Sequence, residues 1–183
     1  MVIGRLPVDD QVDALRAALS RNEVLVEVLA RAAKLDLPGW YLTAGCVFQT
    51  VWNVVAGRSP TAGIRDYDLF YFDVHLWYED HFGVPCAPYT STEVAIDSFA
   101  ATTCCLGIRL GGDGRWRVYA PHGLSDVFNL VVRPQPSAGS PQRLRDQSST
   151  LARTLAGAHR AALARTASQR NVTDFAAWPV RPE

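Results

Sequence analysis

Residues 40–73, WYLTAGCVFQTVWNVVAGRSPTAGIRDYDLFYFD, decide the fold. The run opens with four aromatic and β-prone residues at 40–43, which predict a strand. Residues 44–46, Ala-Gly-Cys, form a small-residue turn. Valine, phenylalanine and tryptophan then recur at helical spacing as far as Gly57, a typical residue just beyond a helix C-terminus. The predicted order is therefore strand, tight turn and buried helix.

Two aspartates lie at the start of the next predicted strand, residues 66–73. Side chains alternate between the faces of a strand, so Asp66 and Asp68 point to the same side. Two carboxylates on one strand end repel each other unless a cation lies between them. Mg²⁺ prefers oxygen ligands from one or two carboxylates together with substrate phosphates. The pair predicts a divalent-metal site, and a solvated strand end is the alternative.

The turn upstream of the aspartates has the features of an anion site. Gly45 allows close approach of the backbone, and the first-turn amides of the following helix are free to hold an anion. A cradle at Gly45 and Cys46 lies about twenty residues before Asp66 and Asp68, on the neighbouring strand. An anion site and a metal-binding pair together predict a nucleoside-triphosphate site. Gly45 alone is equally consistent with a simple tight turn.

The rest of the chain predicts an α+β domain. Residues 10–35 are helical, as one helix or as two joined near residues 20–22. Thr90 and Glu93 have capping-box spacing before a short helix. The remaining predicted elements are strands at 102–110 and 115–120 around a glycine-rich hairpin turn at 111–114, an apolar run at 124–132 that is either strand or helix, and a helix at 144–167. We expect residues 1–134 to form the domain and residues 135–183 a linker and basic helical tail packed on it.

Composition and charge exclude some classes of protein. Hydrophobic residues make up 48% of the 183 residues, enough for one well-filled core. Eighteen basic residues balance eighteen acidic ones, so the chain as a whole has no charge excess for gripping nucleic acid or a membrane. No apolar stretch is long enough to span a bilayer. The four cysteines form no CxxC pair, and we expect free thiols and a cytoplasmic location.

Residues 40–73 resemble the opening of a small bacterial nucleotidyltransferase-like family, whose members read W-Y-x-x-A-G-x-x-x-x-x-V-W followed by D-x-D-x-x-Y-F-D. Later stretches, TTCCLGIRL and VYAPHGLSDVFNLVVRP, resemble further blocks of that family. The resemblance implies a polymerase-β-like nucleotidyltransferase palm with a mixed sheet and flanking helices. It implies that Gly45 and Cys46 hold the triphosphate, and that Asp66 and Asp68 hold Mg²⁺ or Mn²⁺.

The chain departs from that family in two ways. Many nucleotidyltransferases have serine where this chain has Cys46, which replaces a good hydroxyl donor with a weak one. The family also joins its YFD block to its HLWY block through a longer segment, whereas here Asp73 runs directly into Val74. The resemblance would place a third carboxylate in that absent segment. Among the residues present, Asp73, Glu79 and Asp80 are the only nearby substitutes.

Other side chains are weaker candidates. Arg109 projects opposite to its apolar neighbours and could donate to phosphate, although an exposed strand face also accounts for it. Cys46 could act as a nucleophile with His75 or His122, but a small buried thiol is the simpler interpretation.

The sequence therefore predicts a Mg²⁺-dependent enzyme that transfers a nucleotidyl group from a nucleoside triphosphate such as ATP to an unknown acceptor, which is a small molecule, an RNA or a protein. The main alternative is a catalytically degenerate nucleotide-binding or protein-interaction module. A third hypothesis is a hydrolase that depends on Cys46.

Overall fold

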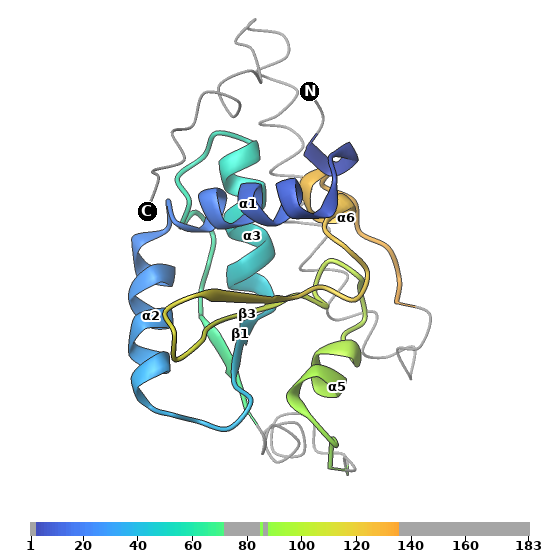
Figure 1. Cartoon of the computed structure of the whole chain (residues 1–183). Helices are drawn as coiled ribbons and strands as arrows, with labels where there is room; N and C mark the ends of the chain where they lie inside the picture. Colours follow the sequence, from blue (N-terminus) through green and yellow to red (C-terminus); the bar gives the residue numbers. More distant parts are fainter. Residues whose placement is uncertain (1–2, 72–84, 86–87, 136–183) are drawn as a thin grey trace, which may run out of the picture.

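The computed structural model describes residues 3–71, 85 and 88–135. Figure 1 shows the chain with several of its elements labelled. The helices are η1 (Ile3–Arg5), α1 (Val8–Leu19), α2 (Glu23–Lys34), α3 (Gly45–Val55), α5 (Thr92–Asp97) and α6 (Ser125–Phe128). The strands are β1 (Tyr41–Thr43), β2 (Asp68–Phe70), β3 (Gly107–Leu110) and β4 (Trp116–Tyr119).

The N-terminal segment forms two helices that are separated at Asn22. Each buries an apolar stripe that includes Leu19 in α1 and Leu25 in α2, both fully buried. The Asn22 side chain accepts a hydrogen bond of 3.1 Å from the Leu25 amide and so caps α2. Of the two arrangements that the sequence left open, the pair of joined helices is the correct one.

The four strands form a sheet in the order β2-β1-β3-β4. In its register, Thr43 at the end of β1 lies opposite Asp68 on one side and Gly107 on the other. The sheet and its flanking helices confirm the predicted α+β class. Every pairing among the described strands is antiparallel, so the parallel neighbours of a mixed sheet are not found in this part of the chain.

Helix α3 is the predicted helix after the 44–46 turn, and it passes through the core. Eight of its eleven residues are buried, so it packs on several sides. The fully buried Trp52 packs its ring against Phe48, with centroids 4.8 Å apart, and its indole N–H donates to the Val127 carbonyl at 2.9 Å. That bond fixes α6 against α3.

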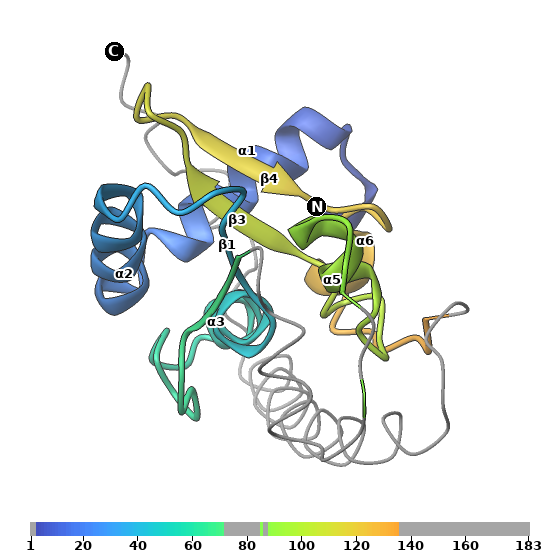
Figure 2. The ribbon, with the colours of Figure 1, turned by 90° about the horizontal axis from the view of Figure 1, so that it is seen from below.

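Helices α1 and α5 lie on opposite sides of the sheet, as Figures 1 and 2 show together. The approach of α5 depends on Gly107 in β3. A Cβ atom at that position would lie 2.9 Å from both Ile96 Cδ1 and Tyr41 Cδ1. Because real Cβ atoms do not approach other atoms so closely, any larger residue here would force the Tyr41 ring and the Ile96 side chain of α5 to shift.

Two predicted strands are shorter in the structure. Strand β2 begins at Asp68, so Asp66 and Tyr67 precede it, and residues 72–73 lie outside the described part of the chain. The strand predicted over 102–110 is wrong before Gly107. Amides in this stretch bond locally instead: that of Cys104 donates to the Ala101 carbonyl at 2.9 Å, which makes a turn.

The structure shifts the predicted helix cap near residue 90 by one position and confirms the predicted hairpin turn. Ser91, and not Thr90, is the N-cap of α5, and its hydroxyl accepts a hydrogen bond of 3.3 Å from the Val94 amide. Ser91 has the extended backbone that an N-cap needs, which explains the shift of one residue. The glycine-rich hairpin is confirmed, since β3 and β4 pair directly and Gly114 has φ +72°.

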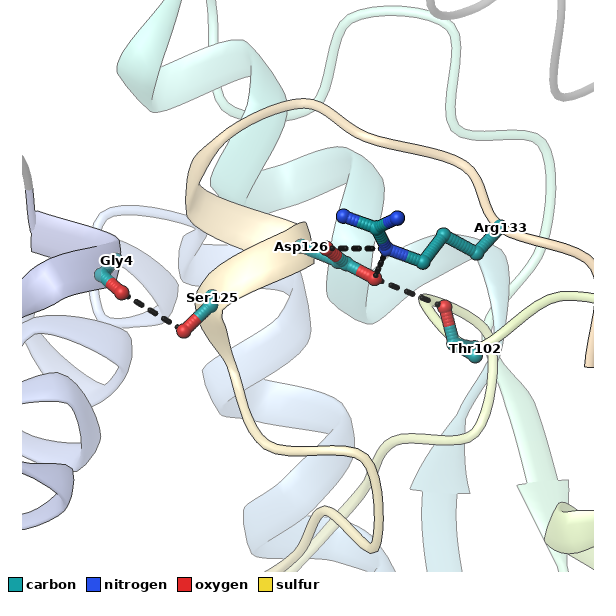
Figure 3. A network of polar contacts seen from close by, with 5 residues as sticks. All are labelled: Gly4, Thr102, Ser125, Asp126 and Arg133. Carbon is teal, nitrogen blue, oxygen red and sulfur yellow. Dashed lines mark hydrogen bonds and ion pairs between the residues drawn. The ribbon is translucent and has the colours of Figure 1, made fainter.

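The apolar run at 124–132 contains the short helix α6, which resolves the choice that the sequence left open. Figure 3 shows how α6 is tied to the chain on both sides. The Ser125 hydroxyl donates to the Gly4 carbonyl at 2.7 Å. Asp126 accepts hydrogen bonds from Arg133 Nε at 2.8 Å and from the Thr102 hydroxyl at 3.3 Å. These contacts give Asp126 a structural partner on each side.

The predicted linker, the predicted helix at 144–167 and Cys86 lie outside the described residues. Within the described part, Cys46, Cys104 and Cys105 are buried free thiols, as expected. No described helix combines the length and the apolar character that a bilayer crossing requires.

Candidate functional site

The turn between β1 and α3 has an unusual backbone, and the first-turn amides of α3 follow it. Ala44 has φ 58° and ψ −135°, a region that residues other than glycine rarely adopt. The Val47 and Phe48 amides donate to the Ala44 carbonyl at 3.2 and 3.4 Å. The amides of Gly45 and Cys46 are therefore the first-turn donors for which α3 itself provides no acceptor.

The aspartates lie directly beside this turn. Asp68 is opposite Thr43, the last strand residue before the turn, and Asp66 precedes it by two positions. Burial, together with the negative charge of Asp66, raises the pKa of Asp68 to about 6. Asp66 itself is exposed, and Asp68 is partly buried. Loss of solvent and a neighbouring negative charge both disfavour ionisation of a carboxyl, and a cation would favour it. The donor set therefore suits a divalent cation, which prefers carboxylate oxygens.

Cys46 lies between the turn and the aspartates. Its fully buried thiol donates to the Thr43 carbonyl at 3.1 Å. Burial and the negative charges of Asp68 and Asp66 raise the pKa of this thiol well above its usual value. The thiol is thus protonated at neutral pH, which does not suit a nucleophile. The structure brings Gly45, Cys46 and the two aspartates to one end of the β1–β2 pair.

The described residues supply two acids to this place and not three. Within residues 3–71, 85 and 88–135, no group of three or more acidic, cysteine or histidine side chains could hold a metal ion. The sequence candidates for a third ligand, Asp73, Glu79 and Asp80, lie outside the described residues, as does His75.

Arg109 lies in β3 beside another set of residues. Its guanidinium carbon is 5.1 Å from the centre of the Tyr41 ring. Glu93 from α5 is also near: partial burial opposes its ionisation, but hydrogen bonds and the charge of Arg109 hold the pKa of Glu93 below its usual value. Arg109 Nε is buried without a hydrogen-bond partner among the described residues. The Arg109 guanidinium thus lies over the Tyr41 ring and its charge acts on Glu93. Its predicted role toward phosphate stays a prediction.

Two buried asparagines near the site were not predicted. The Asn53 amide, on α3, donates to the Pro60 carbonyl at 3.2 Å and to the Ala62 carbonyl at 2.8 Å, and so holds the loop that leads to the aspartates. Asn22 contacts both α3 and the aspartate segment. For Asn53 a signal was present in the sequence, because this amide stands among the apolar residues Val51, Trp52, Val54 and Val55 of α3.

Comparison with known proteins places this arrangement in a family. The sequence model of a nucleotidyltransferase family matches residues 30–74 and 73–153, more than half of the chain. The chain belongs to this nucleotidyltransferase family. The first matched segment contains the β1–α3 turn and both aspartates, and the two segments meet at residues 73–74, where a piece of the family pattern is expected to be missing.

The fold of this nucleotidyltransferase-family chain is similar to a solved structure. An NMR structure described as revealing a CCA-adding enzyme head domain matches it with a TM-score of 0.54 and 23% identity, over 69% of this chain and 80% of the other. At 23% sequence identity, the similarity between the two structures shows a shared fold alone. No curated protein sequence matches the chain. The nucleotidyltransferase resemblance of the sequence is confirmed, and the family supports a role in nucleotidyl transfer with a nucleotide as substrate.

Proposed function

We propose that the protein is a nucleotidyltransferase that uses Mg²⁺ or Mn²⁺ to transfer a nucleotidyl group from a nucleoside triphosphate to an acceptor still to be identified. The observation that carries this proposal is the pairing of Thr43 with Asp68, which sets the aspartates beside the β1–α3 turn. Family membership supports the reaction class.

Each part of the site has a separate task in this proposal. The Gly45 and Cys46 amides donate to triphosphate oxygens at the N-terminus of α3, where the helix dipole favours negative charge. Asp66 and Asp68 hold the divalent ion. The ion, when bound, neutralises phosphate charge and promotes in-line attack on the α-phosphorus.

The residues present fit such an ion. Burial and the charge of Asp66 raise the pKa of Asp68. A cation would favour ionisation of both acids. The buried thiol of Cys46 instead argues against the cysteine-dependent hydrolase, because burial and the adjacent carboxylates keep it protonated.

Labelled-nucleotide transfer tests the proposal. The protein is incubated with each α-labelled nucleoside triphosphate, Mg²⁺ or Mn²⁺ and a cell extract, and the label is followed into acceptor. Asp68→Asn should lower the rate about 100-fold or more, because a ligand of the ion that neutralises phosphate charge is lost. Asp113→Asn, in the exposed hairpin turn, is the control and should react as the wild type does. Equal labelling by wild type and Asp68→Asn contradicts the proposal.

The alternative is a degenerate module that binds nucleotide without transferring it. The observation that favours it is the set of two acids, where superfamily sites have a third, within the described residues. Turnover separates the two: ATP with Mg²⁺ should stabilise the protein in either case, but a degenerate module shows no transfer with any extract.

A further inference from the structure

Asn22 lies at the junction of α1 and α2 and is fully buried. Its side-chain oxygen accepts hydrogen bonds from the Leu25 amide at 3.1 Å and from the Tyr67 hydroxyl at 3.3 Å. Its side-chain nitrogen donates to the Thr50 hydroxyl at 2.8 Å. One amide therefore joins three segments: the start of α2, the middle of α3 and the residue between the two aspartates.

The network continues from Thr50 to the candidate site. The Thr50 hydroxyl donates to the Cys46 carbonyl at 2.6 Å, one turn earlier in α3. Tyr67 lies between Asp66 and Asp68 in the sequence, so its hydroxyl holds the backbone that carries both acids. A continuous hydrogen-bonded path thus runs from the first turn of α3, through Thr50 and Asn22, to the aspartate segment.

Capping of α2 does not explain why residue 22 is an asparagine. An N-cap needs only a side-chain oxygen, which serine, threonine or aspartate supplies equally well. At Asn22 the oxygen also accepts from Tyr67, and the nitrogen donates to Thr50. Buried polar networks of this kind fix one arrangement of the segments that they join, because an unpaired polar group inside the protein is costly.

We propose that Asn22 is a positioning residue of the nucleotidyl-transfer site, which sets the first turn of α3 and the Asp66–Asp68 segment at one separation. This inference rests on the proposed function, in which the turn holds phosphates and the aspartates hold the metal. Phosphate and metal bind cooperatively only if these two parts are held in register. Asn22 acts on that register through Thr50 and Tyr67.

The test measures how strongly metal and nucleotide binding are coupled, which needs no knowledge of the acceptor. The apparent affinity for ATP is obtained from thermal shift with Mg²⁺ and with EDTA, and the ratio of the two affinities is the coupling. Asn22→Ser keeps a cap for α2 but is too short to join Thr50 and Tyr67. Tyr67→Phe removes only the hydroxyl. Tyr71→Phe, four residues later on the same segment, is the matched control.

The coupling ratio should fall about 10-fold or more in Asn22→Ser, in line with the loss of residues that orient metal ligands. The coupling ratio should also fall in Tyr67→Phe, and it should remain within about twofold of wild type in Tyr71→Phe. A residue that matters only for stability would lower the melting temperature without ligand and leave the ratio unchanged, and that result would overturn the inference. If Asn22→Ser does not fold, Tyr67→Phe decides in the same way.

Failure of the positioning role is distinguishable from failure of the proposed function. A wild-type protein without coupling overturns both. Coupling that Asp68→Asn loses and Asn22→Ser keeps overturns the positioning role alone. A measurement on the protein without ligands adds an independent check: Tyr67→Phe and Thr50→Val, which touch opposite sides of Asn22, should have non-additive effects on the urea midpoint. Additive effects would contradict a shared network.

Discussion

Replacement of Asp68 by asparagine should make the protein more stable at neutral pH when no metal is present. Burial and the charge of Asp66 raise the pKa of Asp68 from 3.8 to about 6 in the folded protein. Ionised Asp68 therefore opposes folding. Asparagine has nearly the same shape and no charge, so the variant escapes this penalty while it loses a ligand of the proposed metal.

The sign and size of the effect follow from the pKa difference. Below pH 3.8 Asp68 is protonated in both the folded and the unfolded protein, and the penalty is absent. It grows as the pH rises from 4 to 6 and is complete above the folded pKa of about 6. Two pKa units correspond to about 3 kcal/mol, which partial exposure of Asp68 to solvent reduces to about 1–2 kcal/mol.

Urea unfolding in EDTA at several pH values between 4 and 7.5 measures this difference. The free energy of unfolding of Asp68→Asn should exceed that of wild type by about 1–2 kcal/mol at pH 7.5, and the two should converge near pH 4. Asp113→Asn is a control of opposite sign, because the Arg115 amide lowers the pKa of Asp113 and its ionisation favours folding. An Asp68→Asn variant that is no more stable than wild type at pH 7.5 would refute the account of the acid pair.

Other outcomes test the rest of the site. Gly45→Val should fold and bind ATP about 10-fold more weakly or worse, because a side chain there would crowd phosphate and its Cβ atom would lie 3.3 Å from Gln49 Nε2. Isothermal titration measures this affinity, and an unchanged affinity would place the phosphates elsewhere. Cys46 in the native protein should resist iodoacetamide at pH 7.5, as mass spectrometry of the labelled peptide would show, whereas rapid labelling would contradict its burial and raised pKa. Intact mass should exceed the 20.1 kDa of the sequence if a segment with a third acid lies between Asp73 and Val74, and an equal mass would favour the degenerate module.

Local patterns predicted the elements that carry the candidate site. The turn formers at 44–46, between an aromatic run and a helical apolar repeat, correctly indicated β1 and α3. The alternation from Asp68 onward correctly indicated a strand beside β1, whereas Asp66, which was placed on the same strand, precedes it. These features depend on residues that are near one another in the sequence, and their spacing is therefore sufficient to predict them.

Contacts between distant segments were not predictable from spacing. Asn22 reaches Thr50 and Tyr67, 28 and 45 positions away, and nothing local distinguishes it from an ordinary helix cap. Glu93 meets Tyr41 and Arg109 only because α5 packs on the sheet. The cap at Ser91 was misplaced by one residue because two adjacent hydroxyls can each serve and the backbone angles decide between them.

The backbone at Ala44 has a consequence for how a ligand would be received. Glycine would adopt φ 58° and ψ −135° without strain, yet the chain has alanine there. A Cβ atom narrows the range of conformations open to the turn even while it strains the one observed. Because the surrounding fold must hold this strained residue in place, we expect the amides of Gly45 and Cys46 to be oriented before an anion binds, so that less entropy is lost on binding. Ala44→Gly should raise the free energy of unfolding, because the strain is removed. It should also weaken anion binding, because the amides of Gly45 and Cys46 are then less fixed in orientation.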